Sequence, residues 1–190
     1  MKKILIDFSK VLAPTGISRF VAKNLVPFLT LHEEDIRKIY KNHITWLVLW
    51  EFSIKSLIEE YHPYFHKTTT IDQLYQQFFK IPPIHSAFLS FLQEQKWNDK
   101  TYYLVSDLYP ELWEQIRNTL WTTFDKYLFS YEVGKKKSDP LFWESVIEDD
   151  MTLFIDDRRD NIEQVGKYGI EGYLFTSFDN LVHNRETIWK

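Results

Sequence analysis

Two short apolar runs, one near each end of the chain, end in aspartate. The run KKILID ends at Asp7, and the run MTLFIDD ends at Asp156 and Asp157. Apolar runs of this length bounded by polar residues are typical of buried strands in a parallel sheet. Because ligands collect beyond the carboxyl ends of such strands, we expect the three carboxylates to share one crevice. Their mutual repulsion predicts a bound cation, and an oxygen-lined site suits Mg²⁺.

Strand and helix patterns alternate along much of the chain. The five strand candidates cover residues 4–6, 102–105, 127–129, 153–155 and 173–175. Segments 110–121, 140–148 and 161–168 suit crossover helices, with Pro110 and Pro140 at helix starts and Asp139 as a plausible N-cap. This alternation predicts an α/β fold with a parallel sheet and right-handed crossovers.

The segment between the first two strand candidates is too long for a simple crossover. Apolar residues recur at helical spacing over residues 20–29, 36–58 and 71–79, and Pro27, Pro63 and the Pro82-Pro83 pair are breaks. We therefore interpret residues 14–86 as an inserted helical cap on a core domain formed by residues 1–13 and 87–190. A helix over 86–95 would return the chain to the second strand.

The composition narrows the class of protein. The 190 residues carry a net charge of -4, which provides no basic field for nucleic acid, and 44% of them are hydrophobic, enough for a sizeable core. The chain has no cysteine, and its longest uncharged apolar stretch, around residues 44–50, is too short to span a bilayer. We expect a soluble, cytoplasmic protein that binds neither nucleic acid nor membranes.

Four segments, taken together, resemble the motifs of the haloacid dehalogenase (HAD) superfamily. In chain order they are ILIDFSKVL, TYYLVSD, SYEVGKKKSDPLFW and MTLFIDDRRDN. The resemblance covers essentially the whole chain, with the helical insertion where capped members of the superfamily carry theirs. It implies a three-layer α/β sandwich with a five-stranded parallel, Rossmann-like sheet in the order 5-4-1-2-3, plus an inserted α-helical cap.

The resemblance also implies roles for individual residues. Asp7 would be the nucleophile, whose carboxylate attacks phosphorus or carbon to give an acyl intermediate. Ser106 would bind a phosphoryl oxygen, with Asp107 as a neighbouring substrate-binding candidate. Lys137 would neutralise the nucleophile and the transferred group, with Lys136 as the alternative if the motif is shifted by one residue.

The same resemblance supplies the metal ligands. Asp156 and Asp157 would hold Mg²⁺ together with Asp7 and the backbone carbonyl of Ser9. Magnesium is therefore the expected cofactor, and a small phosphorylated metabolite is the expected substrate. The oligomeric state, monomer or homodimer, stays open.

Positions 9 and 10 depart from the family pattern. Phosphatase members carry a second Asp where this chain has Ser9, and that Asp protonates the leaving oxygen and then activates water. A serine hydroxyl does not titrate near neutral pH, and a positioned acid/base contributes about 10²–10⁴ in rate. Ser9 can still order a water or a substrate group by hydrogen bonding. Lys10 replaces a common glycine, and it either adds positive charge at the mouth of the site or points to solvent.

Three functions follow in order of preference. The first is a Mg²⁺-dependent HAD-like hydrolase of phosphatase type, impaired or altered by Ser9. The second is a pseudoenzyme that binds metal and phosphate ligands without turnover. The third is a dehalogenase, which the full carboxylate cluster disfavours because halide displacement does not need the metal.

Overall fold

The computed structural model describes residues 2–49, 51–95 and 100–189. Its sheet has five parallel strands in the order β3-β2-β1-β4-β5, which is the predicted order read from the opposite edge. The strands are β1 (Lys2–Ile6), β2 (Lys100–Ser106), β3 (Lys126–Phe129), β4 (Met151–Asp156) and β5 (Glu171–Leu174). The α/β fold class predicted from the sequence is confirmed.

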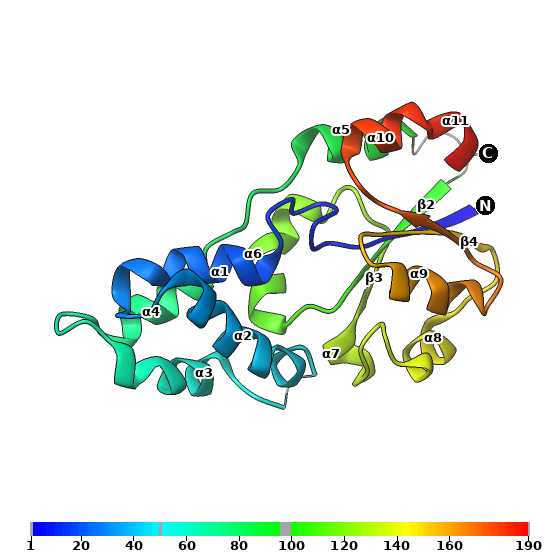
Figure 1. Ribbon diagram of the computed structural model, residues 1–190. Coiled ribbons are helices and arrows are strands. Elements are labelled where there is room, and N and C mark those ends of the chain that lie inside the picture. The colour runs from blue at the N-terminus through cyan, green and yellow to red at the C-terminus, as the bar shows by residue number, and fades with distance from the viewer. Residues whose placement is uncertain (1, 50, 96–99, 190) are drawn as a thin grey trace.

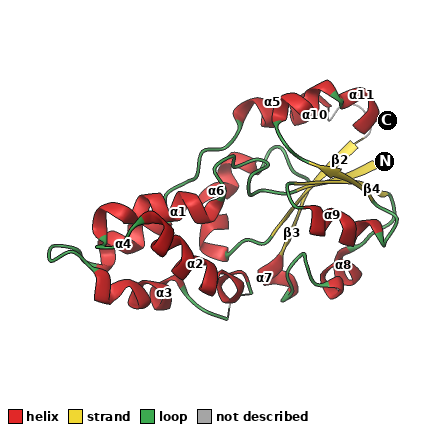
Figure 2. Ribbon diagram, viewed as in Figure 1, coloured by secondary structure: helices red, strands yellow, loops and turns green. Residues whose placement is uncertain are grey.

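Helices cover both faces of the sheet and also form a separate group (Figures 1 and 2). Those that follow β2 in the chain are α6 (Pro110–Leu120), α7 (Ser130–Val133), α8 (Pro140–Val146), α9 (Arg159–Gly166), α10 (Phe178–His183) and α11 (Arg185–Ile188). Between β1 and β2 lie α1 (Ile17–Leu25), η1 (Val26–Phe28), α2 (Glu33–Val48), α3 (Ile54–Tyr61), η2 (His62–Tyr64), α4 (Ile71–Phe78) and α5 (Ser86–Gln95).

Alternate residues of each strand serve the two faces of the sheet, as strand geometry requires. Ile4 and Ile6 of β1 belong to a buried cluster with residues of α5, α6 and α10. Leu5, between them, belongs to a second cluster with residues of α8 and α9. The sheet is therefore buried on both sides, and its strands consist of nearly continuous apolar runs because both faces need apolar side chains.

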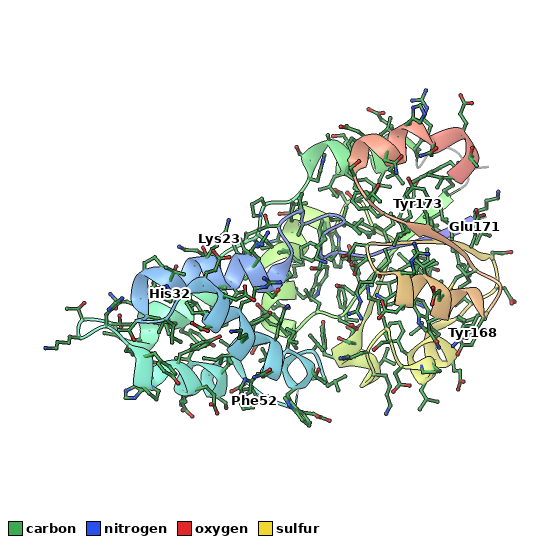
Figure 3. The ribbon with its side chains drawn as sticks, in the orientation of Figure 1. Lys23, His32, Phe52, Tyr168, Glu171 and Tyr173 are labelled. Carbon is green, nitrogen blue, oxygen red and sulfur yellow. The ribbon has the colours of Figure 1, made fainter. Side chains whose placement is uncertain are left out.

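Helices α1 to α4 stand together beyond the carboxyl end of β1, apart from α8, α9, α10 and α11 (Figure 1). Figure 3 gives the same division by side chain: Lys23, His32 and Phe52 lie with this group, whereas Tyr168, Glu171 and Tyr173 lie around α9 and β5. Below we call α1 to α4 the helical group. It contains the helices expected for the cap.

The helical group contacts the sheet domain through two hydrogen bonds that residues near the end of α2 accept. Oγ of Ser130, at the start of α7, donates to the carbonyl of Val48 at 2.7 Å. Nζ of Lys136 donates to Oγ1 of Thr45 at 3.1 Å. These contacts bring α2 against the loops that follow β3, and thus over the carboxyl ends of the strands.

Several predicted elements have other bounds in the structure, and two differences are informative. The segment 36–58 is not one helix: α2 ends at Val48, and α3 begins after Ser53, whose Oγ accepts a hydrogen bond from the backbone N–H of Ser56 at 3.1 Å. Residue 50, within that prediction, lies outside the described residues. The last strand covers 171–174 rather than 173–175, although the N–H of Phe175 still donates to the carbonyl of Asp156 at 2.8 Å.

The helix starts predicted from proline and from an N-cap aspartate are confirmed. Pro110 and Pro140 are the first residues of α6 and α8, and Oδ1 of Asp139 accepts a hydrogen bond from the N–H of Leu141 at 3.0 Å. Among the described residues, we find no helix with the length and hydropathy needed to cross a bilayer.

Candidate active site

The carboxylates at the ends of β1 and β4 lie together. Because β1 and β4 are parallel neighbours with Ile6 opposite Ile155, the residues that follow reach the same edge of the sheet. Asp7, Asp156 and Asp157 each offer a carboxylate oxygen within 4.8 Å of the others. Asp7 and Asp156 are buried and Asp157 is half-buried.

Lys137 lies between two of these carboxylates. Its Nζ is 2.5 Å from Oδ1 of Asp7 and 2.7 Å from Oδ2 of Asp156, and its side chain is 4% exposed. An ammonium this deeply buried needs such partners, since an unpaired buried charge is strongly unfavourable. The two carboxylates and one ammonium thus form a buried ionic cluster.

The loop before α8 fixes Lys137 through its backbone. The N–H of Lys137 donates to Oδ1 of Asp107 at 2.9 Å, and its carbonyl accepts from Nε1 of the buried Trp143 at 2.8 Å. The neighbouring Lys136 instead reaches Thr45 of α2. Of the two lysines that the sequence left open, Lys137 is therefore the one whose ammonium contacts Asp7.

The protonation of the ionic cluster depends on burial and on its charged neighbours. Burial raises the pKa of Asp7 to about 8, the ammonium of Lys137 opposes that shift, and Asp156 adds to it. Burial alone lowers the pKa of Lys137, but attraction to Asp156 and Asp7 outweighs it and raises this pKa overall. Lys137 therefore stays protonated, and a bound cation would stabilise the ionised form of Asp7.

Asn161 and Arg158, both from the last motif, hold Asp156 in place. Nδ2 of Asn161 donates to Oδ2 of Asp156 at 2.9 Å, and the N–H of Arg158 donates to Oδ1 at 2.8 Å. Oδ1 of Asn161 is buried without a hydrogen-bond partner among the described residues. Asn161 belongs to the motif MTLFIDDRRDN, but the sequence alone did not predict its contact with Asp156.

The donor set suits magnesium. Asp7, Asp156 and Asp157 offer carboxylate oxygens that lie within 4.8 Å of one another. Hard oxygen ligands of this kind are those that Mg²⁺ prefers. The residues present therefore fit a magnesium ion.

The turn after Asp7 contains both departures from the family pattern. Oγ of Ser9 lies 3.4 Å from the N–H of Ile17, the first residue of α1. Lys10 has φ of 64°, a left-handed conformation that favours glycine, and its Nζ lies 2.7 Å from Oδ2 of Asp157. The glycine that the resemblance led us to expect at position 10 would suit this backbone, and the lysine adds an ammonium beside a candidate metal ligand.

A cavity of about 290 Å³ joins this edge of the sheet to the helical group. On the sheet side, Asp7, Ser106 and Lys137 line it. Asp156 lies immediately behind, in contact with Lys137. The other predicted site residues, Ser9, Lys10, Asp107 and Asp157, also line it, so the structure brings together every residue that the sequence analysis selected.

Residues of the helical group close the other side of the cavity. Ile17 of α1 and Tyr40, Ile44 and Thr45 of α2 line it there, and Tyr109, just before α6, lines it beside them. Sequence reasoning missed these residues. An apolar or aromatic residue at helical spacing looks the same whether it packs in a core or faces a pocket.

Among the comparisons with known proteins, the search of solved structures finds proteins that share the fold. No family model matches the sequence, and a search of curated proteins finds no match. A structure from Porphyromonas gingivalis, described as a predicted HAD-like family hydrolase, is similar with a TM-score of 0.76 and 19% identity over 100% of this chain and 98% of that one. The HAD family enzyme bt-2542 from Bacteroides thetaiotaomicron, in a magnesium complex, gives a TM-score of 0.76 and 18% identity over 96% and 97%.

A second structure of bt-2542 contains both magnesium and inorganic phosphate. It matches with a TM-score of 0.71 and 19% identity, covering 95% of this chain and 98% of that one. At these identities the likeness establishes the fold. The similarity extends over the full length of each neighbour, so the helical group is part of the shared architecture.

Proposed function

Because the chain has the fold of the haloacid dehalogenase-like hydrolases, we propose that it is a Mg²⁺-dependent phosphohydrolase acting on a small phosphorylated metabolite. The observation that carries the proposal is the contact of Lys137 with both Asp7 and Asp156 at the floor of a cavity closed by α1 and α2. The magnesium and phosphate bound in the similar enzyme bt-2542 agree with it.

In this proposal Asp7 is the nucleophile. Its carboxylate attacks the phosphorus of the substrate, the bond from phosphorus to the leaving oxygen breaks, and an aspartyl-phosphate forms on Asp7 while the leaving oxygen takes a proton from water. A second water then attacks the phosphorus, the bond from phosphorus to the Asp7 oxygen breaks, and inorganic phosphate leaves. Lys137, fixed through Asp107 and Trp143, stabilises charge on the nucleophile and on the transferred group. Ser106, at the end of β2 and in the cavity wall, donates its hydroxyl to a phosphoryl oxygen.

Asp7, Asp156 and Asp157 would hold Mg²⁺, with the backbone carbonyl of Ser9 as a further ligand. When bound, the ion neutralises negative charge on the phosphoryl oxygens and on the carboxylates. The helical group excludes water from the cavity and selects the leaving group. We assign residues 14–86 to this cap and residues 1–13 and 87–190 to the core.

Ser9 favours a second candidate function, a binding protein with little turnover. Its hydroxyl accepts a weak hydrogen bond from Ile17 and has no titratable group with which to activate water. Such a protein would bind Mg²⁺ and phosphate saturably without releasing product. The two candidates share one site and differ only in hydrolysis.

The test is phosphate release from a panel of phosphate monoesters, measured with Mg²⁺ and with chelator. Metal-dependent release that Asp7→Asn abolishes supports the hydrolase. The matched control is Asp35→Asn, since Asp35 is a half-exposed carboxylate of α2, outside the cavity wall, that pairs with Lys38. Saturable phosphate binding without release in the wild-type protein supports the binding function. If the wild-type protein neither binds nor releases phosphate, both candidate functions are contradicted.

A further inference from the structure

Two lysines of the cavity wall lack a carboxylate partner among the residues that the structure describes. Lys41 belongs to α2, and Lys136 belongs to the loop before α8. Lys41 is exposed and Lys136 is half-buried. Nζ of Lys136 donates to the hydroxyl of Thr45 at 3.1 Å, so its hydrogen-bond partner is a neutral group. Two ammonium groups that line a cavity without counterions favour an anionic ligand.

The other cations of the cavity wall each pair with a carboxylate. These pairs are Lys10 with Asp157, Lys137 with Asp7, and Arg158 with Asp160. The remaining carboxylate of the wall, Asp107, accepts the backbone N–H of Lys137. The positive charge left for a ligand therefore belongs to Lys41 and Lys136.

The two lysines meet at one face of α2. Lys41 and Thr45 are four positions apart on this helix, so their side chains lie on the same face, one turn from each other. Lys136 reaches that face from the sheet domain through its hydrogen bond to Thr45. One anionic group bound at this face would therefore lie close to both ammonium groups.

The cavity thus has a cationic group on each of its two sides. On the sheet side, Lys137 contacts Asp7, where the proposed phosphoryl group binds. On the side of α2, Ile44 and Val48 line the cavity together with Lys41. These apolar side chains suit a short aliphatic chain. A ligand that matches both sides has a phosphoryl group at one end, a few carbons in the middle and a second anion at the other end.

We propose that Lys41 and Lys136 form a subsite that binds a second anionic group, a carboxylate or a phosphoryl group, on the leaving group. The substrate class is then a phosphate monoester of a short alcohol that carries this second anion. At about 290 Å³ the cavity lies at the lower end of the usual ligand-pocket range, about 300–1,000 Å³, which favours a short chain. This inference rests on the proposed function and adds to it the recognition of the leaving group by charge.

The test uses phosphonates, which have no ester bond to hydrolyse. Alkylphosphonates with two to four carbons are compared with phosphonates of equal length that end in a carboxylate or in a second phosphonate, by calorimetry with Mg²⁺ present. We expect at least one doubly charged member to bind the wild-type protein about tenfold more tightly than its alkyl counterpart. The preference should fall at high ionic strength. The series with the larger preference tells a carboxylate from a phosphoryl group.

Lys41→Gln and Lys136→Gln remove the two charges. Glutamine at position 136 can still donate to Thr45, so this contact with α2 need not be lost. Each variant should reduce the preference by about threefold, and the double variant should abolish it. Because the preference is the ratio of two affinities measured on the same variant, an effect on the phosphoryl end cancels.

Lys38→Gln and Lys135→Gln are the matched controls. They make the same change of charge on α2 and in the loop before α8, but neither side chain lines the cavity, and each pairs with a nearby aspartate. Both controls should keep the preference for doubly charged phosphonates. If they reduce it as much as Lys41→Gln and Lys136→Gln do, the net charge of the protein causes the preference and the subsite is wrong.

The remaining outcomes separate the two proposals. If inorganic phosphate binds but the wild-type protein prefers neither doubly charged series, the subsite is overturned and the proposed function stands. A preference that survives in the double variant has the same meaning. Failure of the wild-type protein to bind inorganic phosphate at all overturns the proposed function, and the leaving-group subsite with it.

Discussion

Nζ of Lys137 lies 2.5 Å from Oδ1 of Asp7, although the two residues are 130 positions apart in the sequence. The contact is buried, and it joins the loop before α8 to the end of β1. Removing either partner leaves an uncompensated charge away from water. The Lys137–Asp7 pair should therefore contribute to the stability of the fold as well as to the proposed chemistry.

Lys137→Met should destabilise the protein strongly. Breaking a buried ion pair by removing one partner costs about 3–5 kcal/mol. Lys136→Met should cost much less, because Lys136 is half-buried and loses only the hydrogen bond to Thr45. Urea unfolding of the two variants without metal measures the difference. Equal free energies of unfolding would show that the Lys137 contacts contribute nothing beyond an ordinary hydrogen bond.

Lys10 should weaken magnesium binding. Its ammonium lies 2.7 Å from Asp157, so Mg²⁺ must bind against a nearby positive charge. We expect Lys10→Ala and Lys10→Gly to tighten Mg²⁺ binding by about tenfold, or roughly 1.4 kcal/mol, and added salt to reduce the gain. Calorimetric titration at low and high ionic strength measures both effects. Unchanged Mg²⁺ affinity in both variants would contradict the prediction.

The same two variants separate charge from backbone strain. Lys10 has a positive φ of 64°, which alanine retains at a cost and glycine adopts freely. The glycine variant should therefore unfold at a higher denaturant concentration than the alanine variant, with a difference of about 1 kcal/mol. A more stable alanine variant would show that the turn relaxes around residue 10.

Ser9→Asp should raise phosphatase turnover by about an order of magnitude or more, since it restores a group able to transfer a proton. The substitution suits the fold, because a carboxylate can also accept the hydrogen bond of Ile17 and is favoured at the start of α1. Ser9→Asn, similar in size but unable to titrate, should not raise turnover. Equal rates for the two variants would exclude proton transfer as the missing function.

Glu148 should make the stability of the protein depend on acid pH. Hydrogen bonds from Lys126 and then Lys3 lower its pKa from 4.5 to about 2. Because the folded pKa is below the unfolded one, this stabilisation is complete above pH 4.5 and is lost as the pH falls toward 2. Glu148→Gln should lower the melting temperature at pH 6 by about 2–4 °C, with the difference vanishing near pH 2. A constant difference would point to lost packing instead.

The strand-end pattern predicted a parallel sheet with three carboxylates at its edge, whereas the strand order, Ser106 and Lys137 were predicted from the family resemblance. Asp7 and Asp156 each end an apolar run, and parallel pairing alone brings such ends together. Pro110 and Pro140 likewise predicted helix starts, because a missing N–H restricts proline to few helical positions. These are local properties, and each is visible within a few residues.

What the sequence did not predict depends on contacts between distant segments. The role of Lys10 depends on a turn that brings it to Asp157, and Tyr40 meets Tyr109 only once α2 lies against the sheet domain. The break between α2 and α3 was visible in principle, as Ser53 and Ser56 form a local cap. The apolar periodicity continued across it and concealed the boundary.

Lys136 and Lys137 are joined by one peptide bond, yet Lys136 contacts Thr45 of α2 and Lys137 contacts Asp7, the proposed nucleophile. If α2 withdraws to release product, the bond from Lys136 to Thr45 must break, and the backbone that positions the next ammonium loses an anchor. Under the proposed function, a movement of α2 would therefore act on the backbone that places Lys137 against Asp7. The position of α2 would then affect the position of the Lys137 ammonium through the peptide bond between Lys136 and Lys137.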